Sequence, residues 1–300
     1  MPPAAPEPSL IFDRDLLARR RDRHAGSAEA HDFLLARVGD DLAERLSLIK
    51  RRFPLAANIG AHHGLISRRF AGLGGIERIV DVERSLRLLR GCQGLRVAAN
   101  EEALPFADAS LDLVVSGLAL HLVNDLPGAL VQIKRALKPD GLLLAALLGG
   151  GTLNELRHSW LAAEAEVTGG ASPRVAPFAD VRDLGALLQR AGFALPVVDS
   201  EIVTVTYASP LALMQELRAM GASNMLLARR RHPVTRRLLM RAAEIYAERF
   251  GSAGRVPATF EILTLTAWAP DDSQQKPLRP GSAQARLADA LGVPERKLRE

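Results

Sequence analysis

The stretch "LAANIGAHHGLISRRF", residues 55–70, joins an apolar strand pattern to a helix pattern through a turn that contains two glycines. Gly60 and Gly64 allow the backbone to turn tightly and to approach a ligand, because glycine has no Cβ. In open α/β sheets the ligand lies outside the carboxyl ends of the strands, where such turns are found. The stretch therefore predicts the first unit of a doubly wound sheet and a ligand-binding loop.

The chain on either side repeats this alternation. Between 54 and about 148, apolar strand patterns alternate with amphipathic helix patterns, which predicts βαβ units and an α/β fold with a mostly parallel, seven-stranded-type sheet. Helices are expected over 64–73, 84–90, 125–138 and 183–193, and a further strand over 199–209. We expect a terminal segment and helical lead-in over 1–52, the main domain over 53–269 with added elements from about 150, and a flexible tail over 270–300.

Composition limits the class of protein. The 300 residues are 48% hydrophobic, with no apolar run near the roughly 20 residues that cross a bilayer and no secretory or transit signal pattern at the start. Cys92 is the single cysteine, so we interpret it as a packing residue in a reducing, cytoplasmic chain. The sequence gives no indication of oligomeric state.

The net charge is +5, and arginine clusters occur at 18–24 and 228–237. They carry no interleaved aromatic residues of the kind that stack bases, so nucleic acid is not expected as a partner. Solvated helix faces explain them most simply, and an acidic protein or peripheral contact with a membrane surface are the alternatives.

Polar residues follow the expected strands. Asp81 ends the second strand pattern, 21 residues after Gly60, where a carboxylate would accept hydrogen bonds from ribose hydroxyls. Asn100 and Glu101 follow the third strand, and Ser116 the fourth, with His121 close behind. Because carboxyl ends of parallel strands share one edge of the sheet, these residues are the candidate cofactor site.

A dinucleotide loop of the G-x-G-x-x-G type needs glycine where this chain has His62, whose Cβ would crowd a pyrophosphate. NAD is therefore disfavoured. S-adenosylmethionine has no phosphate to hold, so it tolerates the G-x-x-x-G spacing better.

The segment "ANEEALPFADASLDLVVSGLALHLVNDLPGALVQIKRALKPDGLLLAAL" (99–147) resembles the core of class I S-adenosylmethionine-dependent methyltransferases. With "IFDRDL" (11–16), "TLNELR" (152–157), "MGASN" (220–224) and "VPATFEI" (256–262), the chain resembles the NADH:ubiquinone oxidoreductase complex assembly factor 5 family over about 11–269. The resemblance implies a methyltransferase fold, S-adenosylmethionine as cofactor, and modification of an arginine on a subunit of respiratory complex I, by hydroxylation rather than methylation.

The chain departs from the family pattern in the cofactor loop. Asn58 replaces an acid, His62 replaces the central glycine, Asn100 replaces a second acid, and the family's H-W pair is His121-Leu122. If Asn58 meets the cofactor's ammonium group, losing the ionised acceptor costs about 1.5 to 3 kcal/mol. We therefore expect weaker cofactor binding than in relatives that keep the full motif.

Candidate catalytic residues are fewer, because methyl transfer to a positioned substrate needs mainly orientation and desolvation. His121 either caps a helix or faces the reactive end of the cofactor. Glu155 of "TLNELR", or Glu164 and Glu166, could pair with a substrate guanidinium, or they are exposed helix acids. No H-x-D…H metal triad is present at convincing spacing, so no metal site is predicted.

Three functions stay open. The first is modification of a complex I subunit. The second is carboxyl O-methylation of a small molecule, which predicts a closed, apolar substrate cavity. The third is a non-catalytic assembly chaperone whose pocket has decayed, which predicts no cofactor binding. For the first, "TLNELR" and "MGASN" are expected to line the substrate side rather than the core.

Overall fold

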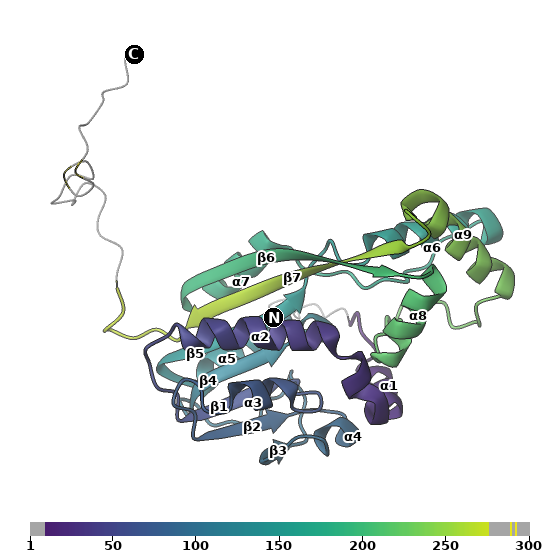
Figure 1. Cartoon of the computed structure of the whole chain (residues 1–300). Helices are drawn as coiled ribbons and strands as arrows, with labels where there is room; N and C mark the ends of the chain where they lie inside the picture. Colours follow the sequence, from purple (N-terminus) through teal and green to yellow (C-terminus); the bar gives the residue numbers. More distant parts are fainter. Residues whose placement is uncertain (1–9, 276–288, 290–291, 293–300) are drawn as a thin grey trace, which may run out of the picture. The chain divides into compact units, whose positions relative to one another are not determined.

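The computed structural model describes residues 10–275 together with 289 and 292. Its central sheet has seven strands in the order β3-β2-β1-β4-β5-β7-β6, and Figure 1 shows helices on both faces. The strands are β1 (Leu55–Ile59), β2 (Arg78–Val82), β3 (Leu95–Val97), β4 (Leu111–Gly117), β5 (Leu137–Leu148), β6 (Ala194–Tyr207) and β7 (Val256–Trp268). The helices are α1 (Arg14–His24), η1 (Ala25–His31), α2 (Phe33–Ser47), α3 (Leu65–Phe70), α4 (Leu86–Leu89), η2 (Leu120–Leu122), α5 (Leu126–Ala136), α6 (Asn154–Thr168), α7 (Val181–Arg190), α8 (Pro210–Ala219) and α9 (Arg236–Phe250).

The first five strands are parallel, as the alternating pattern predicts. β7 runs antiparallel between β5 and β6, so the predicted doubly wound, mostly parallel sheet is confirmed. β1 and β4 are almost wholly buried because helices cover both faces of the sheet at this point. The carboxyl ends of β1, β2, β3 and β4 therefore lie together at one edge.

The two faces have separate cores. Side chains of α2 and α3 pack on one face, and those of α5 and α7 on the other. α5 begins where Asp125 accepts a hydrogen bond from the Gly128 N–H, 2.8 Å away, and a proline follows in the first turn.

The predicted lead-in belongs to the main core. Leu42 and Leu46 of α2 have no exposed surface and pack with Phe53, Phe70 and the sheet. Residues of α1 instead contact the strand ends, as described below. Residues 10–52 are thus an integral layer of the fold rather than an appendage.

Beyond the end of β5, β6 and β7 continue as a two-stranded ribbon. Leu148 pairs with Ile262, whereas β7 residues from Val256 to Glu261 pair only with β6. Figure 1 shows α6, α8 and α9 gathered around this end of the ribbon. The ribbon thereby places a helical wall beside the carboxyl edge of the parallel strands.

The chain divides into two units, Met1–Pro270 and Asp271–Glu300. Most of the predicted tail, 270–300, lies outside the described residues, so its flexibility stays a prediction. None of the helices in the described part of the chain is long and apolar enough to span a membrane.

Candidate active site

The glycine loop, residues 58–64, turns from β1 into α3 through three residues with positive φ, at every second position. Gly60, His62 and Gly64 have φ values of +69°, +53° and +79°. A Cβ on Gly60 would lie 2.1 Å from the Cβ of Ala119, so only glycine fits there. His62 adopts the left-handed conformation without being glycine, which is strained unless neighbours compensate.

Asp81 lies behind this loop rather than at its front. Its Oδ1 accepts hydrogen bonds from Asn58 Nδ2 at 3.0 Å and from Ser67 Oγ at 2.5 Å, and the residue has no exposed surface. Burial raises the pKa of the Asp81 carboxyl, and the hydrogen bonds from Ser67 and Asn58 oppose that rise. Asp81 therefore ties β1, β2 and α3 together.

Glu83 is the carboxylate that meets the loop. It follows β2 and is fully buried, and its oxygens accept hydrogen bonds from the backbone N–H groups of His62 at 3.0 Å and Ser85 at 2.9 Å. Arg21 of α1 lies 3.4 Å from Glu83 Oε1. Glu83 is not among the site residues predicted from the sequence, although it lies two positions after Asp81, and side chains two positions apart in an extended chain point to the same side.

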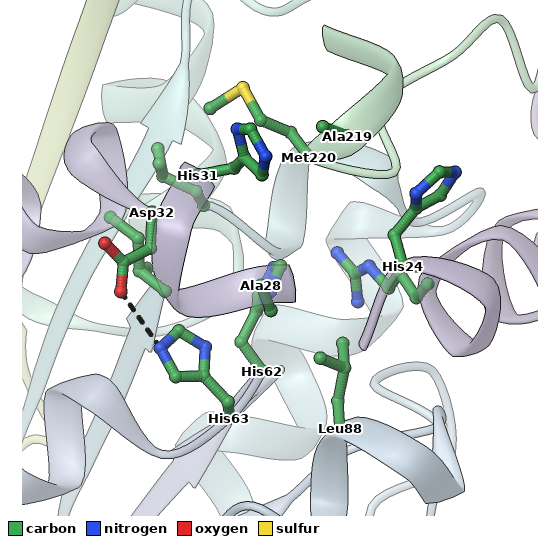
Figure 2. A pocket seen from close by; sticks show the side chains of 12 residues that line it. His24, Ala28, His31, Asp32, His62, His63, Leu88, Ala219 and Met220 are labelled. Carbon is green, nitrogen blue, oxygen red and sulfur yellow. Dashed lines mark hydrogen bonds and ion pairs between the residues drawn. The ribbon is translucent and has the colours of Figure 1, made fainter. Parts of the chain in front are cut away.

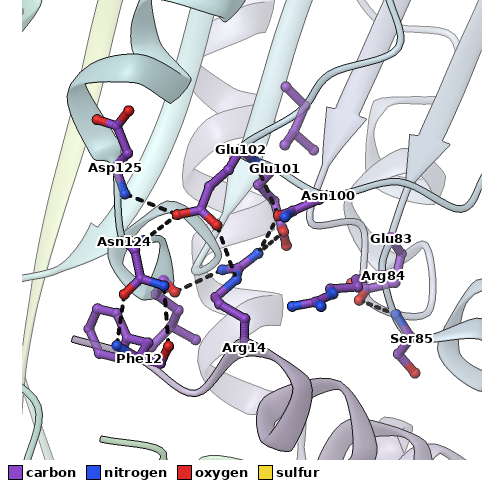
Figure 3. A network of polar contacts seen from close by, with 12 residues as sticks. Phe12, Arg14, Glu83, Arg84, Ser85, Asn100, Glu101, Glu102, Asn124 and Asp125 are labelled. Carbon is purple, nitrogen blue, oxygen red and sulfur yellow. Dashed lines mark hydrogen bonds and ion pairs between the residues drawn. The ribbon is translucent and has the colours of Figure 1, made fainter. Parts of the chain in front are cut away.

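Glu101 converges on the same loop from the end of β3. Its Oε1 would lie 3.5 Å from a Cβ placed on Gly60. Figure 3 shows Arg14 of α1 reaching between Asn100, Glu101 and the backbone. Its guanidinium pairs with Glu101 and donates to Asn100 Oδ1 at 2.9 Å and to the Leu122 carbonyl at 2.7 Å.

Arg14 and Arg21 of α1 thus pair with Glu101 and Glu83, the two acids that face the loop. The crevice lined by Arg14, Arg21, Glu83 and Glu101 has a free volume of about 0 Å³. On the other side of Arg21, His62 and His63 line a cavity of only about 60 Å³ (Figure 2). His63 Nε2 is held 3.0 Å from Asp32 Oδ2, so this cavity is bounded by fixed polar groups.

The polar groups present fit an adenosyl cofactor. Glu83 and Glu101 are hydrogen-bond acceptors at adjacent strand ends, and Asn58 Oδ1 is buried without a hydrogen-bond partner in the described structure. The space between them is filled by α1, so a cofactor enters only if Arg14 and Arg21 withdraw. Ser116 is less available, because its hydroxyl is buried and donates to the Ile59 carbonyl at 2.7 Å.

His121 lies where the strand ends meet a second, larger cavity. The cavity has a volume of about 390 Å³ and includes His121 and Phe178 in its wall. His121 Nδ1 accepts a hydrogen bond from the Leu148 N–H at 3.4 Å, so Nε2 carries the proton of the neutral ring. Burial, with a smaller contribution from Arg21, lowers the pKa of His121 to about 3. His121 is therefore neutral at pH 7.

We call this the apolar cavity; it lies among α6, α8 and β7. Its wall is mainly apolar and includes Leu153, Leu156, Trp160, Met214, Leu217 and Phe260. Both family motifs reach it, "TLNELR" through its leucines and "MGASN" through Asn224, whose side chain also donates to the Pro173 carbonyl at 2.8 Å.

Glu155 is directed elsewhere. Its carboxylate accepts hydrogen bonds from the hydroxyl of Thr259 at 2.5 Å and the backbone N–H of Thr259 at 3.3 Å, so it joins α6 to β7. Glu164 is buried and paired with Arg174, and Glu166 pairs with Arg241. The structure thus places the three candidate acids in contacts within the fold. Among the described residues, no group of three or more His, Cys, Asp or Glu is arranged to hold a metal ion.

Comparison with known proteins gives relatives over almost the whole chain. A methyltransferase domain family matches residues 57–145. Arginine-hydroxylase NDUFAF5, mitochondrial, is 40% identical in Danio rerio, covering 93% of this chain and 89% of the relative. The same protein of Homo sapiens is 39% identical, covering 93% and 83%. The chain belongs to the NDUFAF5 family.

Further matches come from one sequence relative and one solved structure. A malonyl-[acyl-carrier protein] O-methyltransferase of Methylovorus sp. is 33% identical over 87% of this chain and 91% of its own. Among solved structures, the YcgJ protein of Bacillus subtilis superposes with a TM-score of 0.53 at 13% identity, covering 77% of this chain and 99% of that chain. The methyltransferase domain match confirms the predicted methyltransferase-type fold.

Proposed function

We propose that this member of the NDUFAF5 family is an enzyme that modifies an arginine of a protein substrate, a subunit of respiratory complex I. The observation that carries the proposal is the convergence of Glu83 and Glu101 on the glycine loop, next to a neutral His121 that opens onto the apolar cavity. The names of the NDUFAF5 relatives support arginine as the target. The resemblance drawn from the sequence supports complex I as the source of the substrate.

We assign S-adenosylmethionine as the cofactor. When bound, it supplies a methyl group activated for in-line displacement. Glu83 and Glu101 would accept hydrogen bonds from it, and Asn58 Oδ1 would accept one from a donor that enters the loop. His121 would stand at the substrate side, where its Nε2–H can donate a hydrogen bond.

The test is mass spectrometry of complex I subunits from cells that lack this protein and from cells complemented with it. We expect one arginine-containing peptide to lose the mass of an oxygen atom or a methylene group without the protein, and to regain it on complementation. The two masses distinguish hydroxylation from methylation. Identical arginine modification in both samples would contradict the proposal.

The apolar cavity favours a second candidate, carboxyl O-methylation of a small or carrier-bound substrate. This candidate predicts such a cavity, and the malonyl-[acyl-carrier protein] O-methyltransferases are relatives over most of the chain. Transfer of labelled methyl from S-adenosylmethionine to a malonyl-carrier substrate would support it. The compartment stays a prediction, since the NDUFAF5 relatives are named mitochondrial whereas the sequence predicts a cytoplasmic chain.

A further inference from the structure

The second arginine cluster of the sequence lies at the apolar cavity. Arg229, Arg230 and Arg231 line a cleft of about 490 Å³ together with Arg20 and Arg174. We call this the basic cleft. Arg174, Asn224 and Val234 belong to the walls of both spaces, so the basic cleft and the apolar cavity adjoin.

The basic cleft has more positive than negative charge. Arg174 is neutralised by buried Glu164, and Arg229 lies 3.0 Å from Asp13. Arg20 donates to the carbonyls of Ser223 and Asn224 at 2.6 Å, which leaves its charge unbalanced. Burial and the neighbouring charges of Arg229 and Arg23 lower the pKa of Arg20, as expected where positive charges crowd.

Two further arginines add charge at the surface. Arg230 and Arg231 are exposed and make no ion pair within the described part of the chain. The residues that line the cleft include His232 but no Phe, Tyr or Trp, the side chains that most often stack on bases, which disfavours nucleic acid. The unpaired guanidinium groups instead suit a phosphate or a carboxylate, whose oxygens they can hold in forked geometry.

We propose that the two spaces form one binding site for an anionic amphiphile. Its apolar chain lies in the apolar cavity, among Leu156, Leu217 and Phe260, and its phosphate or carboxylate is held in the basic cleft by Arg20, Arg230 and Arg231. The proposal uses the cavity assigned above to substrate and rests on that assignment, but it requires neither bound cofactor nor a particular reaction.

Calorimetric titration with monomeric dodecyl phosphate tests the site directly. We expect binding of one molecule per chain, weakened about tenfold or more in the double variant Arg230→Ala/Arg231→Ala, because the charged head loses its partners. The matched control is Arg236→Ala/Arg237→Ala, which removes two exposed arginines outside both spaces and should leave binding unchanged. Equal binding of uncharged dodecanol, or equal loss in the control, would overturn the proposal.

A second measurement locates the chain of the ligand. The protein has two tryptophans, and Trp160 lines the apolar cavity whereas Trp268 does not. In a Trp268→Phe variant, terminally brominated dodecanoate should quench the fluorescence of Trp160, and unlabelled dodecyl phosphate should reverse the quenching. Binding without quenching would place the ligand outside the cavity and contradict the proposal.

Two sources of such a ligand can be distinguished. Retention of the protein on phosphatidylglycerol vesicles, lost in Arg230→Ala/Arg231→Ala, would identify a membrane lipid. Binding to the monomer without retention on vesicles would identify a soluble acyl ester. None of these titrations contains cofactor. A negative result would therefore contradict the amphiphile site without contradicting the proposal that the protein modifies an arginine.

Discussion

His62 has a strained backbone conformation, and its side chain lines the small cavity beside the glycine loop. Its positive φ costs about 1 to 3 kcal/mol when neighbours do not compensate. Its carbonyl accepts a weak hydrogen bond from Cys92 Sγ at 3.4 Å, and its N–H donates to Glu83, so the loop holds the conformation from both sides. Cys92 itself is buried, with its pKa raised to about 12, in keeping with a packing role.

We expect His62→Gly to bind S-adenosylmethionine more tightly than the wild type, by about 1 kcal/mol. Glycine adopts the observed φ without strain, and removing the ring enlarges the cavity of about 60 Å³ beside the loop. Titration calorimetry with S-adenosylmethionine and S-adenosylhomocysteine measures the change. Weaker binding by the variant would show that the imidazole contacts the cofactor, and no binding by either protein would favour the non-catalytic chaperone.

We expect substitution of Asp81 to lower mainly the stability of the fold, and substitution of Glu83 to lower mainly the affinity for the cofactor. Asp81→Ala leaves buried Asn58 and Ser67 donors without their acceptor, so we expect the free energy of unfolding to fall by about 1 to 3 kcal/mol. Glu83→Gln should instead weaken cofactor binding by about 1.5 to 3 kcal/mol. Denaturant unfolding and calorimetry on both variants check the pair. A larger binding loss in Asp81→Ala than in Glu83→Gln would restore Asp81 to the cofactor site.

At the scale of elements, α1 is the part that closes the site. Arg14 and Arg21 lie two turns apart, so they project from one face of the helix toward Glu101 and Glu83. Both carboxylates are buried, and each guanidinium removes an acceptor from any ligand that approaches the loop. The helix therefore competes with the cofactor for the same two groups.

We expect Arg21→Gln to lower the dissociation constant for S-adenosylmethionine about tenfold, since Glu83 becomes free to accept. The free protein should unfold at a lower temperature, because Glu83 remains buried without its counter-charge, and added cofactor should restore more stability than in the wild type. Calorimetry and thermal unfolding measure the two effects.

The control for this prediction is Arg23→Gln, an exposed arginine of the same helix. It should leave affinity and stability unchanged. If Arg21→Gln binds cofactor less tightly than Arg23→Gln, α1 helps to hold the cofactor instead of competing with it.

For the whole molecule, two half-buried histidines, His62 and His121, make the free energy of unfolding depend on pH. Burial lowers the pKa of His62 well below 6.5 and that of His121 from 6.5 to about 3. Between the folded and unfolded pKa values the unfolded chain binds more protons, so the free energy of unfolding rises with pH in this range. This contribution is complete above about pH 6.5 and is lost as the pH falls toward the folded pKa values.

We expect His121→Gln to flatten the decline in unfolding free energy between pH 6.5 and 4, because one depressed pKa is removed while an oxygen remains to accept from Leu148 N–H. Urea unfolding over this pH series measures the slope. His158→Gln, an exposed residue of α6, is the matched control and should keep the wild-type slope. An unchanged slope in His121→Gln would mean that His121 titrates normally.

The candidate site was predicted less completely than the fold. The strand-end rule located the loop, Glu101 and His121, because carboxyl ends of parallel strands must meet at one edge. It named Asp81 and did not consider Glu83, because the position of an acid along a strand does not tell whether its carboxylate is taken up by contacts within the fold. For the same reason the sequence left two roles for Glu155, a partner of a substrate guanidinium or an exposed helix acid. Its carboxylate instead bonds to Thr259, 104 residues further along the chain.

The sequence by itself determined the layers of this protein. The period of its apolar residues and the placing of its glycines are local properties, and they predicted the alternating elements, the parallel sheet and the turn after β1. The tertiary structure alone decided which polar groups are available. α1 brings Arg14 and Arg21 to acids more than 60 positions away. α6, α8 and β7 each contribute side chains to the wall of one cavity. Such contacts depend on how separate elements pack against one another, so they cannot be predicted from a local sequence pattern.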